Sequence, residues 1–456
     1  MPSLLTVSLL APALAAGPSS PELSGGRVPF GAADRAPAPG PGVHHEHERL
    51  AMQASTRGPA PPPAPSARPD KVVYGYLPYW TVGPEDVPWD HLTHLAIFNV
   101  DLESDGSLSD TSRWTGVAAD AVAMGHAAGV KVHLCVTSFD DDVMDAVLSS
   151  ASRRAAAIEA LGALVDAYGA DGVNVDFEGM PSARRDDLVT FTRDLRARVG
   201  EVWLATPAVD WSDAYDYPAL ADASDGLFIM GYAYHYTGGG AGPNSPLSPG
   251  DIWSRWALDW TVDDYLATGA PADKIVLGLP SYGQEWPVSS GSAVPADTTD
   301  DGWSVVYTDA VADAATYGRA YDTASDTPWF TRSETRQAWY DDADSLAVKM
   351  DWAVGEAGLA GFGFWAIGYD GNDPALWAAV DAASHTPGGT DTGADDTGTP
   401  DGTPDDTDRP PRAQLLAESA GCGCDSGGGV GMGLWTVVLL GVRRARRPSP
   451  TRDAAW

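Results

Sequence analysis

The clearest alternation of polar and apolar positions lies at residues 171–179, which read DGVNVDFEG. Successive side chains of a strand point to opposite faces, so Asn174, Asp176 and Glu178 share one face. The apolar residues that alternate with them are Val173, Val175 and Phe177. This pattern is typical of a strand in a parallel barrel, whose outer side packs on helices and whose carboxyl end opens on a site.

Strand-like and helix-like segments alternate from residue 71 to residue 385. The predicted strands are 72–77, 94–100, 130–137, 171–179, 202–207, 226–232, 274–279 and 361–367. The predicted helices are 114–128, 151–168, 183–199, 253–268 and 375–383. Eight such strands within about 315 residues predict an α/β fold, a (β/α)8 TIM barrel. Residues 287–344 are predicted to be a small insertion between strands seven and eight.

The segments that flank the predicted barrel differ from it in composition. Residues 1–16 contain an apolar run too short to cross a bilayer, followed by small residues, and are predicted to be a signal peptide. No Lys or Arg precedes that run, which departs from the usual signal. Residues 17–70 are rich in Pro, Ala and Gly, and residues 386–420 in Thr, Asp, Gly and Pro, so both are predicted to be linkers.

The C-terminal segment 421–447 combines Cys422 and Cys424, a short apolar run and a cluster of Arg. This order resembles the myxobacterial C-terminal sorting segment, in which a Cys receives an anchor after the tail is cut. The resemblance implies a secreted protein that is tethered at the outer cell surface or released from it. It also implies tail-processing or sorting machinery at the membrane as a partner. The other interpretation, a metal or redox site, lacks further ligands near the two Cys.

The overall composition narrows the possible partners. A net charge of −35 argues against nucleic acid, whereas an acidic surface is compatible with a neutral polymer such as chitin. Three Cys are too few for a disulfide scaffold. His44, His45 and His47 lack an acidic or Cys cluster at ligand spacing, so we predict no metal and no cofactor. We expect the protein to be a monomer.

The two carboxylates of the strand at 171–179 suggest acid catalysis. Asp176 and Glu178 lie about 6.6 Å apart along a strand that rises about 3.3 Å per residue. Two carboxylates at that spacing repel, so one of them tends to hold a proton at neutral pH. A protonated Glu beside an ionised Asp is what general acid catalysis requires. The alternative is that the pair is only solvated or salt-bridged.

A longer pattern resembles the signature of glycoside hydrolase family 18, D-x-x-(D/N)-x-D-x-E, which this chain matches with Asp171, Asn174, Asp176 and Glu178. Four further segments resemble the family in the expected order: YGYLPYW, MGYAYHY, KIVLGLPSYGQEW and GFGFWAIGYDG. Many chitinases of the family carry Asp where Asn174 stands. The Asn form resembles the branch that includes bacterial spore-cortex peptidoglycan glucosaminidases.

The resemblance implies a retaining mechanism in which the acetamido oxygen of the substrate is the nucleophile. Glu178 then donates a proton to the leaving oxygen and later accepts one from water. Asp176 bonds the acetamido N–H and stabilises the charged intermediate, and Tyr232 donates to the acetamido carbonyl. Trp365 forms the floor under the reacting sugar, Tyr76 lines the same subsite, and Asn174 lies beneath Asp176. Ala233 departs from the family, which usually has an acidic residue after the Tyr.

The leading functional prediction is a secreted glycosidase that hydrolyses β-1,4 bonds of N-acetylglucosamine polymers, either chitin or peptidoglycan, by endo or exo action. The alternative is a weak or inactive barrel that binds chitin or peptidoglycan. Inactive relatives typically lose the Glu of the motif, whereas this chain keeps Glu178. A third interpretation, a structural surface protein, is disfavoured by the aromatic residues at the strand ends.

Overall fold

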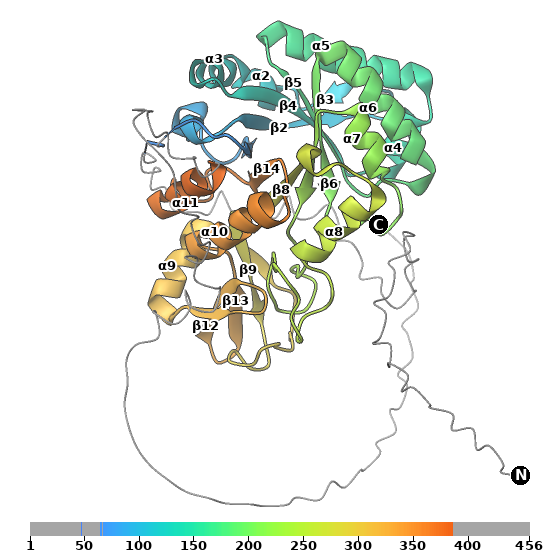
Figure 1. Cartoon of the computed structure of the whole chain (residues 1–456). Coiled ribbons are helices and arrows are strands. Elements are labelled where there is room, and N and C mark those ends of the chain that lie inside the picture. The colour runs from blue at the N-terminus through green and yellow to red at the C-terminus, as the bar shows by residue number, and fades with distance from the viewer. Residues whose placement is uncertain (1–46, 48–63, 66, 386–456) are drawn as a thin grey trace, which may run out of the picture. The chain divides into compact units, whose positions relative to one another are not determined.

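The computed structural model describes residues 47, 64, 65 and 67–385 (Figure 1). The predicted signal peptide, the acidic linker and the C-terminal segment lie outside the described residues, as does most of the 17–70 linker. The described part therefore covers the predicted barrel and its insertion.

Eight parallel strands of the described chain form a closed barrel. The barrel strands are β1 (Val72–Pro78), β2 (His94–Leu102), β4 (Lys131–Ser138), β5 (Gly172–Phe177), β6 (Glu201–Pro207), β7 (Gly226–Met230), β8 (Ile275–Pro280) and β14 (Gly361–Trp365). Pairing of β1 with both β14 and β2 closes the ring, and β3 (Leu108–Ser109) adds an antiparallel partner to the end of β2. This arrangement confirms the predicted (β/α)8 TIM barrel.

Helices surround the barrel, as Figure 1 shows for α3 to α8. They are α2 (Ser112–Thr115), α3 (Ala118–Ala128), α4 (Asp141–Leu148), α5 (Ala151–Tyr168), α6 (Arg185–Val199), α7 (Tyr217–Ala223), α8 (Leu258–Thr268), α10 (Ala343–Asp351) and α11 (Pro374–Ser384). Shorter turns of helix are η1 (Pro84–Asp86), η2 (Trp89–His91), η3 (Ser182–Arg184), η4 (Ala272–Lys274) and η5 (Trp352–Glu356). Within the described residues, no helix has both the length and the apolar character that a membrane span requires.

A second sheet lies between β8 and β14 in the sequence. Its antiparallel strands are β9 (Tyr282–Pro287), β10 (Trp303–Val306), β11 (Ala320–Asp322), β12 (Thr327–Ser333) and β13 (Arg336–Trp339), and it carries α9 (Tyr307–Tyr317). Buried aromatic side chains such as Trp286, Trp339 and Phe330 give it cores of its own. Because β9 begins two residues after β8 ends, the sheet extends from the carboxyl end of the barrel (Figure 1).

The barrel wall separates two apolar layers. Val173, Val175 and Phe177 of β5 pack outward with the helices, in the larger core cluster. The inner cluster is mainly aromatic and contains Tyr74, Tyr76, Phe98, Trp203, Phe228 and Trp365. The strand alternation expected at 171–179 is therefore present, with the polar side chains facing the barrel interior.

Candidate active site

Two of the predicted site residues lie on β5, and a third follows it. Asn174 is fully buried and Asp176 is 2% exposed, whereas Glu178 follows the last residue of the strand. The backbone N–H of Glu178 donates to the Ser138 carbonyl at 3.0 Å, which fixes the strand end against β4. The Tyr215 hydroxyl donates to the Phe177 carbonyl at 2.5 Å from the other side. Both carboxylates are thus carried on backbone that β4 and the segment between β6 and α7 hold in place.

Tyr232 and Tyr76 both lie near Asp176. Burial raises the pKa of the Tyr232 phenol well above its usual range, and nearby Tyr282, Asp176 and Glu178 raise it further. Burial also raises the pKa of Tyr76, with Asp176 among the contributing charges. Both phenols therefore keep their protons, which makes Tyr232 a hydrogen-bond donor at any pH relevant to catalysis.

The turn that carries Tyr232 is fixed by hydrogen bonds to other segments. β7 ends at Met230 rather than at residue 232 as predicted, and the N–H of the next residue, Gly231, donates to the Gly278 carbonyl of β8 at 3.0 Å. Ala233 has the left-handed φ of 60°, and its N–H donates to Asn244 Oδ1 at 3.0 Å. Asn244 is fully buried and also donates to the Tyr282 carbonyl at 3.1 Å. Asn244 therefore ties the turn after β7 to β9.

Trp365 ends β14 and forms an aromatic wall of the site. It is 3% exposed, and its ring centroid lies 4.8 Å from Phe98 and 5.7 Å from Tyr76. Its indole N–H donates to Nδ1 of His47 at 3.1 Å. The His47 ring is 2% exposed and lies edge-on to Tyr282, with centroids 4.4 Å apart. A residue of the predicted N-terminal linker thus contacts the predicted sugar-binding aromatic residues.

Asn174 belongs to a chain of hydrogen bonds below Asp176. Its Nδ2 donates to the Tyr74 hydroxyl at 3.2 Å, and its Oδ1 accepts from the Cys135 thiol at 3.4 Å. The Tyr74 hydroxyl also lies 2.9 Å from Nδ1 of His133. Because the hydroxyl accepts from Asn174, its own proton is directed to His133, which fixes the orientation of the Asn174 amide.

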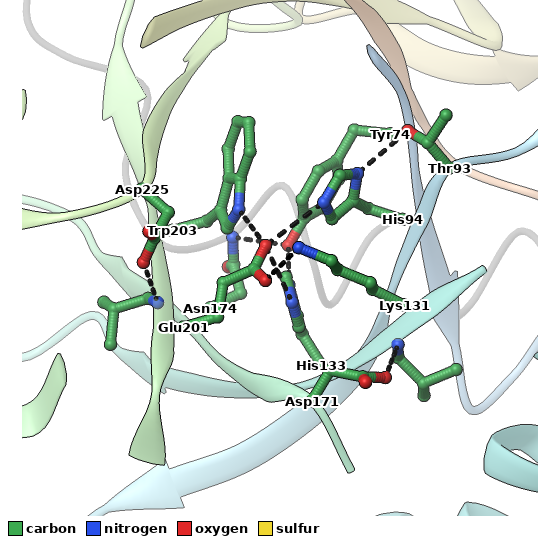
Figure 2. A network of polar contacts seen from close by, with 12 residues as sticks. Tyr74, Thr93, His94, Lys131, His133, Asp171, Asn174, Glu201, Trp203 and Asp225 are labelled. Carbon is green, nitrogen blue, oxygen red and sulfur yellow. Dashed lines mark hydrogen bonds and ion pairs between the residues drawn. The ribbon is translucent and has the colours of Figure 1, made fainter. Parts of the chain in front are cut away.

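This chain ends in a cluster of charged groups at the amino end of the barrel, shown in Figure 2. The Glu201 carboxylate accepts from Trp203 Nε1 at 2.9 Å, lies 3.1 Å from His94 Nε2, and pairs with Lys131. Burial tends to raise the pKa of Glu201, but these donors and the neighbouring His133 outweigh burial and hold the pKa below its usual range. Burial, together with the nearby His94, lowers the pKa of His133 to about 3. His133 is therefore neutral near pH 7.

A cavity of about 430 Å³ lies at the carboxyl ends of β1, β2 and β4, and its lining includes Thr137 and Ser138 of β4, the strand that pairs with β5. Among the described residues, the acidic side chains that come close enough to share a metal ion are Asp140, Asp141 and Asp142, which are exposed and near this cavity. The same three residues begin α4, where Asp140 accepts from the N–H groups of Asp142 and Val143 as an N-cap. Capping accounts for the position of Asp140.

The structure brings the six predicted site residues together along the barrel axis, and their chemical roles remain predictions. They are Glu178, Asp176, Tyr232, Tyr76, Trp365 and Asn174. Sequence reasoning missed Asn244, His47 and the residues that line the cavity. The aromatic residues at the ends of β1 and β2, in the runs LPYW and IFN, could have indicated an aromatic-lined cavity from the sequence alone.

Comparison with known proteins identifies the family of the barrel. The family model described as "Glycosyl hydrolases family 18" matches residues 72–370. A putative sporulation-specific glycosylase of Bacillus subtilis is 27% identical over 256 residues, which cover 52% of this chain and 56% of the relative. A probable endochitinase of Caenorhabditis elegans is 28% identical over 270 residues, which cover 51% of this chain and 42% of the relative. The chain thus spans about half the length of these curated relatives.

Solved structures support the same fold. A chitinase from Cycas revoluta, crystallised in complex with (GlcNAc)3, superposes with a TM-score of 0.62. It is 20% identical, and the match covers 68% of this chain and 99% of that one. At this identity the likeness shows the barrel architecture.

Proposed function

The chain belongs to glycosyl hydrolases family 18, and we propose that it hydrolyses β-1,4 bonds of N-acetylglucosamine polymers by a retaining, substrate-assisted mechanism. The observation that carries the proposal is the convergence of Asp176, Glu178 and the protonated Tyr232 at the carboxyl end of the barrel. Active sites of TIM barrels lie at this end of the strands.

The proposed reaction has two steps. First, Glu178 gives its proton to the glycosidic oxygen as the bond from that oxygen to C1 breaks, and the substrate's own acetamido oxygen bonds to C1. Asp176 accepts a hydrogen bond from the acetamido N–H, and Tyr232 donates one to the acetamido carbonyl, which fixes the line of attack. Water then attacks C1, its proton passes to Glu178, and the acetamido group re-forms. Two inversions at C1 retain its configuration.

The aromatic residues bind the sugar in this proposal. Trp365 and Tyr76 supply apolar faces next to Asp176, as the ring distances and the charge effect on Tyr76 support. Pockets that bind small ligands are commonly lined by such aromatic side chains, with a few polar groups that fix orientation.

The test uses the full chain, chitin oligosaccharides and peptidoglycan, with products identified by mass spectrometry. We expect wild type to release N-acetylglucosamine-terminated products and Glu178→Gln to lose at least about 10³-fold in kcat, since general acid catalysis contributes about 10²–10⁴-fold. Glu334→Gln, an exposed change in the second sheet, is the matched control. Full turnover by Glu178→Gln would refute the assignment of the acid.

A second candidate is a barrel that binds these glycans without cleaving them. The observation that favours it is Ala233, which stands where the family usually has an acidic residue. Calorimetric binding separates the two candidates. Saturable binding of chitin oligosaccharides without any product from either polymer would establish the binding protein instead.

We also propose that the protein is exported and tethered at the outer cell surface through segment 421–447. The support is the order of Cys, apolar run and Arg cluster in that segment. Cell fractionation tests the proposal. We expect the barrel to be recovered in the outer-membrane or surface fraction, and to be released when residues 421–456 are deleted. Recovery in the cytoplasm contradicts the proposal.

A further inference from the structure

The cavity next to the carboxylates lies where a polymer held at Asp176 and Glu178 would continue. Its lining residue Thr137 pairs in register with Asp176, and its lining residue Ser138 accepts from the N–H of Glu178. A second link runs through Phe98, which lines the cavity and lies against Trp365 with centroids 4.8 Å apart. The cavity and the predicted catalytic centre therefore share walls.

Aromatic side chains form the apolar part of this cavity. Tyr79, Trp80, Phe98 and Phe139 line it, and Tyr79 is 37% exposed. The volume of about 430 Å³ falls within the usual range of about 300–1,000 Å³ for ligand pockets. Aromatic faces with open space beside them suit the flat, weakly polar face of a sugar ring.

The charged side chains that line the cavity are three carboxylates, Asp101, Asp110 and Asp140, and one guanidinium, Arg113. The donors of Arg113 are already engaged. It contacts Asp101 Oδ2 at 3.2 Å and Asp110 Oδ2 at 2.9 Å, donates to Asn99 Oδ1 at 3.1 Å, and stacks over the Tyr79 ring at 4.3 Å. The lining carries a net charge of −2, and its single cation is neutralised by its neighbours.

The Asp101 carboxylate is held in place as firmly as Arg113. Its Oδ1 accepts from Asn99 Nδ2 and from the Thr137 hydroxyl, both at 2.6 Å. Since Asp101 and Arg113 restrain each other, an incoming carboxylate has to break an existing ion pair before it can reach the guanidinium. An incoming ammonium group can reach the exposed Asp140 without breaking an ion pair, because that carboxylate accepts from the backbone N–H groups of Asp142 and Val143.

We propose that this cavity is a subsite for a 2-amino sugar that is uncharged or carries an ammonium group, and that it rejects a sugar with a free carboxylate. The inference rests on the proposed function and makes its substrate class narrower. Fully or partly N-acetylated chitin chains can bind with such a sugar in the subsite, provided that the reacting unit keeps its acetamido group. A glycan in which N-acetylglucosamine alternates with N-acetylmuramic acid places a lactyl carboxylate in the subsite next to every reacting unit.

The test compares three glycans of equal length: chitin oligomers, partly de-N-acetylated chitin oligomers, and peptide-free peptidoglycan strands with free lactyl carboxylates. Affinities are measured by calorimetry at pH 6 on full-length Glu178→Gln, so that the ranking does not depend on turnover. We expect the carboxylate glycan to bind at least about tenfold more weakly than chitin oligomers, and the difference to shrink in 1 M salt, where the Debye length is about 3 Å.

The matched variant is Asp110→Asn with Asp140→Asn, which brings the lining charge to zero. Asn suits both positions, because Asp110 has a left-handed φ of 52° and Asp140 is an N-cap. We expect the carboxylate glycan to gain about tenfold in affinity and chitin oligomers to stay within about twofold. Asp213→Asn, with φ 56° and an Arg partner outside the cavity lining, is the control.

The outcomes separate the two proposals. The subsite inference is overturned if Glu178→Gln binds all three glycans with equal affinity, even if wild type cleaves chitin. It is also overturned if adding Asp110→Asn and Asp140→Asn leaves the affinity ranking unchanged. Failure of wild type to cleave any glycan overturns the proposed function, while the affinity ranking still decides the subsite inference.

Discussion

Asn174→Asp tests how a charge beneath Asp176 affects the site. The two side chains share one face of β5, about 6.6 Å apart at about 3.3 Å per residue, and both are almost fully buried. At an effective dielectric constant of about 20, two carboxylates at that distance repel by about 2.5 kcal/mol. At about 1.36 kcal/mol per unit, this corresponds to about 1.8 pH units. We therefore expect the acid limb of the pH–rate profile to move up by one to two units.

The surrounding hydrogen bonds allow the change without an orphaned donor. In wild type the Tyr74 hydroxyl oxygen accepts from the Asn174 amide. In the variant, the hydroxyl instead donates its proton to the new carboxylate. His133 then has to present a protonated Nδ1 to the Tyr74 oxygen, which a neutral imidazole does by changing tautomer. We expect a loss of stability of about 1–3 kcal/mol from the buried charge.

The assay is kcat/KM for a chitin oligosaccharide between pH 3 and 8, with thermal unfolding of the same samples. Asn174→Ala is the control, since it removes the same hydrogen bonds and adds no charge. We expect Asn174→Ala to lower the rate and leave the acid limb in place. An acid limb for Asn174→Asp within about 0.3 units of wild type would refute the coupling between position 174 and Asp176.

Three further predictions concern other parts of the described chain. Ala233→Asn stabilises the fold by about 0.5–1 kcal/mol in thermal unfolding, because Asn tolerates the φ of 60° better than Ala does. His47→Ala lowers KM a few-fold, since the imidazole covers Trp365 and Tyr282, and an unchanged KM contradicts this. Folding stability decreases as the pH is lowered from about 6.5 to about 3, because His133 takes up a proton in the unfolded chain but stays neutral in the folded one. Urea titrations at several pH values check this: in His133→Asn, the slope of the unfolding free energy against pH decreases by up to about 1.4 kcal/mol per pH unit.

The strand alternation and helix signals of the barrel were readable because they depend on local sequence. Helix α5 begins after Ser150, whose side chain caps it, and ends at Gly169 in the left-handed conformation, so its predicted bounds match the structure. The predicted helix 253–268 begins later, at Leu258. Trp253 fits the helical pattern but instead donates its indole N–H to Asp322 of the second sheet at 2.6 Å. A contact across 69 residues overrides the local pattern there.

The parts of the site that escaped prediction depend on contacts between distant residues. Asn244 has no motif around it, and its importance appears only when its side chain bridges Ala233 and the β9 backbone. The ion pair of Arg113 with Asp101 depends on the approach of α2 to β2, whereas its pair with Asp110 is local, three residues earlier in the sequence. The second sheet was predicted only as an insertion, since its strands pair antiparallel across long loops that carry weak alternation.

The Cys135 thiol gives the barrel a built-in chemical reporter. It is fully buried at the centre of the barrel, next to Asn174, and burial raises its pKa well above the usual range. A thiol reagent can therefore reach it only when the barrel opens, and the labelling rate measures the free energy of that opening. Mass spectrometry of the peptide around Cys135 separates its signal from Cys422 and Cys424. Each tenfold change in rate with bound glycan then reports about 1.4 kcal/mol of stabilisation beside β5.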